Sequence, residues 1–150
     1  MTLAFGEWII HRRWYAGRTR QLASAEPSSA TSLGQDLEHV LLDVTYTDGC
    51  TERYQVLIRW EDTPGDGYGD GALIGTATGP GGTRTAYDAL FDPRSARHLL
   101  SLIDSSVTVD GLTFSKEPNV TLPVDAPPKV SGAEQSNTSV IFGKDAMLKV

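Results

Sequence analysis

An Asp-Gly pair between two runs of β-forming residues most constrains the fold of this chain. Asp48 and Gly49 separate residues 41–47, where polar and apolar side chains alternate, from residues 52–60, which are rich in large apolar side chains. Asp-Gly favours tight hairpin turns because glycine adopts a positive φ without steric cost. The pattern therefore predicts an antiparallel β-hairpin over residues 41–60.

Helices are predicted only in short segments. Trp8, Ile9, Ile10 and Trp14 are spaced for one apolar helix face that ends near Ala16-Gly17. Residues 94–103 follow an aspartate and a proline, which suit a helix cap and first turn. A further short helix is expected around residues 87–91.

The remaining β-structure is predicted from shorter signals. A strand is expected to begin at Leu22, and another lies around residues 72–75 in a glycine-rich surface connection that ends at residues 79–82. Residues 107–115 form a second hairpin across an Asp-Gly turn. Prolines 118, 123, 127 and 128 indicate an extended connector without helix. Two strands around a Gly-Lys-Asp turn follow, up to residue 150. The fold class expected is α+β, an antiparallel sheet flanked by short helices and followed by a β-rich part.

Composition excludes several classes of function. The net charge of −6 argues against a nucleic-acid partner, which requires a concentrated basic surface. No apolar stretch approaches the ~20 residues of a membrane helix, and the N-terminus does not resemble a signal peptide. A single cysteine, Cys50, is typical of a reducing compartment, so a soluble cytoplasmic protein is expected. His11, His39 and His98 lack ligand spacing, and no metal site is predicted. Residues 65–71 resemble a flexible loop more than a calcium site.

Lys149 ends a short apolar run, Ala146-Met147-Leu148, in the second terminal strand. A kinase-like nucleotide site places such a lysine on its third strand, where the ammonium pairs with ATP phosphates beneath a covering loop. Ser136, Asn137, Thr138 and Ser139 would form that loop and supply hydroxyl and backbone N–H groups. The alternative is an ordinary lysine that protects a strand edge, after a polar loop that binds nothing. The pattern alone leaves both readings open.

The chain resembles the N-terminal part of the actinobacterial maltokinases, which transfer phosphate from ATP to maltose. Residues 12–18, Arg-Arg-Trp-Tyr-Ala-Gly-Arg, are similar to an Arg-x-Arg-Trp-aromatic-Ala-Gly segment of that family, with His11 at the first arginine position. Residues 133–142 resemble the family's phosphate-covering loop. Four shorter blocks match in order between them, at residues 44–49, 52–57, 99–103 and 117–118.

The resemblance implies a cap subdomain over residues 1–90, an intermediate subdomain and Pro-rich connector over 91–132, and the start of a protein-kinase-like N-lobe over 133–150. It also implies ATP and Mg²⁺ in the complete kinase, with maltose as acceptor and maltose 1-phosphate as product for glycogen-like α-glucan synthesis. No catalytic residue is assigned in this chain, because the catalytic aspartate is expected beyond residue 150. The chain alone is therefore expected to be inactive.

Two alternative functions remain open. The chain could be a non-catalytic cap that docks trehalose synthase, a partner implied by the family, or it could cap a related kinase for another sugar such as glucosamine. Trp8, Trp14 and Trp60 are expected to pack in the core, where tryptophan buries much apolar area, rather than to bind carbohydrate.

Overall fold

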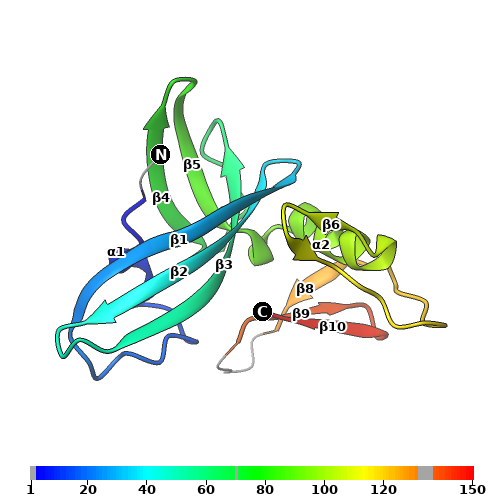
Figure 1. Ribbon diagram of the computed structural model, residues 1–150. Helices are drawn as coiled ribbons and strands as arrows, with labels where there is room; N and C mark the ends of the chain where they lie inside the picture. The colour runs from blue at the N-terminus through cyan, green and yellow to red at the C-terminus, as the bar shows by residue number, and fades with distance from the viewer. Residues whose placement is uncertain (1–2, 70, 132–136) are drawn as a thin grey trace.

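The computed structural model describes residues 3–69, 71–131 and 137–150. Within these residues the protein is mostly β: a curled five-stranded antiparallel sheet, two small sheets and two short α-helices (Figure 1). The predicted α+β class is therefore correct in its antiparallel sheet and short helices, but the helical share is small. The elements in chain order are α1 (Phe5–Ile9), β1 (Leu22–Gly34), β2 (Leu37–Tyr46), β3 (Thr51–Glu61), β4 (Leu73–Gly79), β5 (Gly82–Asp88), the 3₁₀ turn η1 (Ala89–Phe91), α2 (Pro93–Ser105), β6 (Thr108–Val109), β7 (Leu112–Thr113), β8 (Pro128–Val130), β9 (Ser139–Phe142) and β10 (Ala146–Lys149).

The hairpin predicted around Asp48-Gly49 is confirmed as β2 and β3. Leu42 lies opposite Tyr54, and the chain reverses at Gly49 with a φ of 87°. Asp48 Oδ1 accepts a hydrogen bond from the N–H of Cys50 at 2.9 Å, which supports the turn. Alternate residues of β2 are buried, so this hairpin forms the centre of the sheet, whose strand order is β1-β2-β3-β5-β4.

Strand β1 is much longer than the sequence indicates. This thirteen-residue strand pairs with β2 along one edge of the sheet, with three register shifts, and residues 26–30 are exposed. The segment is rich in serine and alanine and contains Pro27, so its local β-propensity is weak. Pairing with the strongly patterned β2 outweighs that propensity, and an edge strand tolerates the proline.

The glycine-rich segment before residue 82 was expected to be a surface connection with one short strand. Instead β4 and β5 form a hairpin across residues 79–82, and β5 pairs with β3 through Ala86 opposite Trp60. The short helix expected around residues 87–91 is confirmed only as a 3₁₀ turn over Ala89–Phe91. Strand β5 runs to Asp88, whose carboxylate caps the single 3₁₀ turn η1. The tertiary pairing of β5 with β3 explains both differences.

The first helix is α1 and is shorter than expected. It ends at Ile9, and Trp8 and Ile9 are buried against the sheet. Gly17 is not a helix stop as predicted; the absence of a side chain there lets two tyrosine hydroxyl groups lie close to the backbone. A Cβ atom there would lie 2.1 Å from the hydroxyl oxygen of Tyr46 and 2.5 Å from that of Tyr15.

Helix α2 agrees with the prediction. Asp92 Oδ2 accepts a hydrogen bond from the N–H of Ser95 at 3.1 Å, and Pro93 occupies the first turn. The helix ends at Ser105, and the following residue, Ser106, adopts a left-handed φ of 51°. The β6–β7 hairpin across the second Asp-Gly turn is confirmed as well.

Two apolar clusters hold the molecule together. One fills the curl of the large sheet under α1, and the other joins the end of that sheet to α2 and the terminal strands. Val140 and Phe142 of β9 belong to the second cluster and are at most 1% exposed. Part of the predicted connector forms β8, which pairs with β9. Among the described residues no helix is long and apolar enough to cross a membrane.

Candidate functional site

The terminal hairpin brings Lys149 directly opposite Ser139. Strands β9 and β10 are antiparallel, with Met147 opposite Ile141 and Lys149 opposite Ser139. Directly opposed residues project to the same face of a sheet, and successive residues project to opposite faces. Lys149 and Ser139 therefore share one face of the small sheet with Met147 and Ile141.

This outer face is cationic. Lys129 of β8 pairs with Ile141 and lies on it too, and strands β8, β9 and β10 contain no acidic residue. Lys149 and Met147 are exposed, whereas Val140 and Phe142 are buried on the inner face against α2. Lys149 has no ion pair within the described ranges.

Ser139 is a buried hydroxyl beside this lysine. Ser139 is only 3% exposed, and its Oγ has no hydrogen-bond partner in the part of the chain that the structure describes. An unsatisfied buried hydroxyl costs free energy, so such a group is a candidate for interaction with a ligand or another segment.

The other loop residues lie differently. Thr138 exchanges two backbone hydrogen bonds of 3.0 Å with Val150, so its N–H is already used in the ladder. Its side chain projects to the face opposite that of Ser139 and, with Asn137 and Val150, lines a pocket. Ser136 lies outside the described residues. The structure thus brings together Ser139 and Lys149 and places Asn137 and Thr138 on the side of the large sheet.

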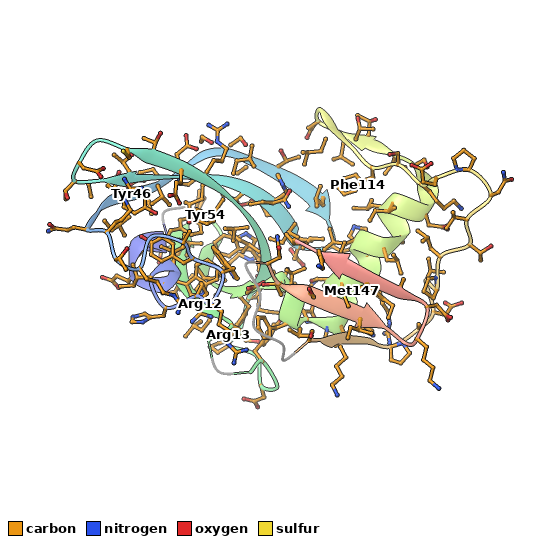
Figure 2. All side chains as sticks on the ribbon, turned by 90° about the horizontal axis from the view of Figure 1, so that it is seen from below. Arg12, Arg13, Tyr46, Tyr54, Phe114 and Met147 are labelled. Carbon is orange, nitrogen blue, oxygen red and sulfur yellow. The ribbon has the colours of Figure 1, made fainter. Side chains whose placement is uncertain are left out.

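The pocket on that side has a volume of about 270 Å³ and lies where α1, β3 and the terminal hairpin meet. Trp8, Trp14 and Tyr54 line it, and so does Asp88 at the end of β5. Figure 2 shows Tyr54 and Arg12 toward the end of the molecule that holds α1, and Met147 on β10 beyond them. Trp8 and Trp60 are buried as expected, while Trp14 is half-buried at this pocket.

Asp88 is the polar residue of this pocket that the sequence did not reveal. It is 4% exposed, and Oδ1 accepts a hydrogen bond from the N–H of Leu90 at 3.1 Å. Burial raises the pKa of this carboxyl to about 6, and the Leu90 N–H and the Arg12 guanidinium offset part of that rise. The local sequence resembles a helix start, so an aspartate there reads as a cap and not as a pocket residue.

The histidines have structural contacts. His39 Nε2 lies 2.8 Å from Gln55 Oε1, and His98 Nε2 lies 2.7 Å from the carbonyl oxygen of Leu33. No group of three or more His, Cys, Asp or Glu side chains that could hold a metal ion occurs among residues 3–69, 71–131 and 137–150.

The curled sheet, closed by α1, is a small antiparallel β-domain. It is followed by α2 and by a second, smaller sheet that contains the hairpin with Lys149. The family model described as the maltokinase N-terminal cap domain matches residues 8–92, more than half of the chain. The protein belongs to this family, which confirms the resemblance found in its sequence.

Proposed function

We propose that this chain is the N-terminal part of an ATP-dependent maltokinase, which converts ATP and maltose to maltose 1-phosphate for α-glucan synthesis. The match to the family's cap domain carries the proposal. The exposed Lys149, with the buried Ser139 directly opposite it on the same face of the small sheet, supports the proposal. The maltokinase family implies the use of ATP and Mg²⁺.

The residues of the outer face fit a phosphate group. A lysine ammonium is a mobile point charge suited to phosphate, and Lys149 is exposed without an ion pair among the described residues. Ser139 offers a hydroxyl oxygen on the same face, and Lys129 adds a second positive charge. Bound Mg²⁺ neutralises phosphate charge in such kinases. The role of this chain is therefore to orient the nucleotide. Asn137 and Thr138, the neighbouring part of the predicted covering loop, lie on the other side of the small sheet.

We divide the chain as the resemblance implies, into a cap over residues 1–90, an intermediate subdomain over 91–132 and the start of the N-lobe from 133. The two apolar clusters support a division near η1, because the first lies within the large sheet and the second includes α2 and the terminal strands. The single free and exposed Cys50 is compatible with a reducing cytoplasm.

Two finer points belong to the same proposal. The acceptor is proposed to be maltose, with another sugar such as glucosamine as the alternative. The second candidate function is a cap that docks a partner protein such as trehalose synthase. The long edge strand β1 favours it, because among the described residues no strand pairs with its outer side.

The nucleotide role is tested by titrating the 150-residue chain with MgATP while backbone amide shifts are followed by NMR. We expect shifts at Ser139 and Lys149 in the wild type, and loss of these shifts in Lys149→Met. Lys144→Met, in the turn between the strands, is the matched control and should behave as the wild type. No shift in the wild type, or equal shifts in Lys149→Met, would remove the basis for the nucleotide role. The chain alone is expected not to phosphorylate maltose, because no catalytic aspartate is assigned in it.

A further inference from the structure

The pocket between the large sheet and the terminal hairpin contains the carboxylate of a buried aspartate. Asp88 lines the pocket and is 4% exposed. Only Oδ1 takes part in a hydrogen bond, with the N–H of Leu90, and Oδ2 has no such partner within the described residues. Oδ2 is not one of the fully buried side-chain atoms that lack a partner, so it is accessible to a hydrogen bond from a ligand hydroxyl.

Aromatic rings form a continuous wall beside this carboxylate. The ring centroids of Trp8 and Trp14 are 5.7 Å apart in an edge-to-face arrangement, and those of Trp14 and Tyr54 are 5.5 Å apart. All three residues line the pocket. Aromatic side chains combine large apolar surfaces with polar tips, so such a wall suits a ligand with both C–H and O–H groups.

The charges around the pocket are balanced. Arg53 lines it, but its guanidinium is paired with Asp43 through contacts of 2.6 and 3.0 Å. The Arg12 guanidinium interacts electrostatically with Asp88. It also lies over the Trp8 ring, 5.3 Å from the ring centroid, and donates a hydrogen bond to the carbonyl oxygen of Gly71. Arg53 is offset by Asp43 and Asp88 by Arg12, so the pocket carries no strong net charge that would attract an ion of either sign. The balance favours a neutral ligand.

We propose that this pocket binds a neutral, polyhydroxylated molecule of about monosaccharide size, with one hydroxyl donating to Asp88 Oδ2 and the carbon skeleton against Trp14 and Tyr54. The volume of about 270 Å³ lies just below the range of drug-sized sites. Asn137 and Thr138 provide polar groups from the terminal hairpin, so the ligand bridges this hairpin and the large sheet. The site is on the opposite side of the small sheet from Lys149 and does not depend on the nucleotide role.

The experiment uses tryptophan fluorescence, because Trp8 and Trp14 line the pocket and Trp60 does not. The Trp60→Phe variant of the 150-residue chain removes the distant reporter. Titration of this variant with D-glucose and with myo-inositol is expected to give a saturable fluorescence change for at least one of them. Choline serves as a cationic probe. The absence of a saturable change with both neutral probes, or a saturable change with choline alone, overturns the proposal.

Variants locate the binding. Asp88→Asn keeps an acceptor that can cap η1 and is expected to weaken binding at least tenfold, because a charge-assisted hydrogen bond is lost. Asn137 is exposed, and Asn137→Ala is expected to weaken binding several-fold. Asp104→Asn lies outside the pocket lining and is the matched control. If Asp88→Asn does not fold by circular dichroism, Asn137→Ala alone decides.

Binding that neither folded pocket variant weakens would place the ligand elsewhere and overturn the proposal. Lys149→Met should leave this binding unchanged, so the pocket and the nucleotide role can fail independently.

Discussion

Glu61, the last residue of β3, accepts a hydrogen bond of 2.5 Å from Nη2 of Arg94 in the first turn of α2. The same carboxylate oxygen, Oε1, accepts hydrogen bonds from Tyr68 at 2.9 Å and Arg59 at 3.3 Å. Asp92, the cap of α2, also pairs with Arg94 at 3.1 Å. One small polar network therefore ties the large sheet to the helix that follows it.

Removal of Arg94 is expected to destabilise the junction. Arg94→Ala deprives Glu61 and the buried Asp92 of a donor, so we expect a loss of about 1–2 kcal/mol in the free energy of unfolding in urea. Arg53→Ala breaks a more exposed ion pair with Asp43 and should cost less than about 1 kcal/mol. Equal effects of the two variants would contradict this account of the junction.

The stability that this network contributes is expected to fall at low pH. Burial alone would raise the pKa of Glu61, but hydrogen bonds from Tyr68 and Arg94 outweigh it and lower that pKa. A carboxyl with a lowered pKa contributes stability above its unfolded pKa of about 4.3 and loses it as pH falls through the folded value. Glu61→Gln should therefore show a smaller loss of unfolding free energy than the wild type between about pH 5 and pH 3 in urea titrations. A parallel pH dependence in both proteins would show that Glu61 does not contribute.

The pH dependence of stability expected from Asp88 has the opposite sign to that expected from Glu61. Its pKa is raised to about 6, above its ordinary value, so the folded state holds a proton more tightly than the unfolded chain. Its contribution to stability therefore falls as pH rises from about 4 to about 6, by up to about 3 kcal/mol. Asp88→Asn should not show this fall, so the difference between the unfolding free energies of wild type and variant should change over this pH range. A difference that stays constant over this pH range would contradict the burial of a charged Asp88.

Gly17 is predicted to be intolerant of any side chain. A Cβ atom would lie 2.1 Å from the hydroxyl oxygen of Tyr46, whose residue is 1% exposed. Gly17→Ala should cost about 2–4 kcal/mol, measured by urea unfolding, because both tyrosines would have to move. A Cβ atom at Gly81 would meet no atom of the described residues within 4 Å, so Gly81→Ala should change stability by about 0.5 kcal/mol or less. Tolerance at position 17 equal to that at 81 would refute the close packing described here.

The two faces of the terminal hairpin should differ in stability effects. Phe142→Ala empties a fully buried position against α2 and should cost about 3–5 kcal/mol. Met147, on the outer face, is 53% exposed, and Met147→Ala should have an effect near zero. Thermal unfolding followed by circular dichroism compares the two variants. Similar melting temperatures would show that the hairpin does not pack on the helix as described.

The sequence alone was sufficient where a local signal and the tertiary structure agree. Asp48-Gly49 determined the central hairpin, and Asp92-Pro93 determined the start of α2, because a turn or a cap depends on a few neighbouring residues. The blocks around residues 12–18 and 133–142 were sufficient to suggest the family, which the match over residues 8–92 then showed.

The tertiary structure decided what depends on distant partners. Strand β1 has weak local propensity and exists through its pairing with β2, and the glycine-rich segment became a hairpin through its pairing with β3. Strand alternation separated Thr138 from Ser139 although they are neighbours in sequence, so only Ser139 faces Lys149. Asp88 became a pocket residue only because α1, β3 and the terminal hairpin meet around it. Burial and charge environment arise from residues far apart in the chain, and no local pattern encodes them.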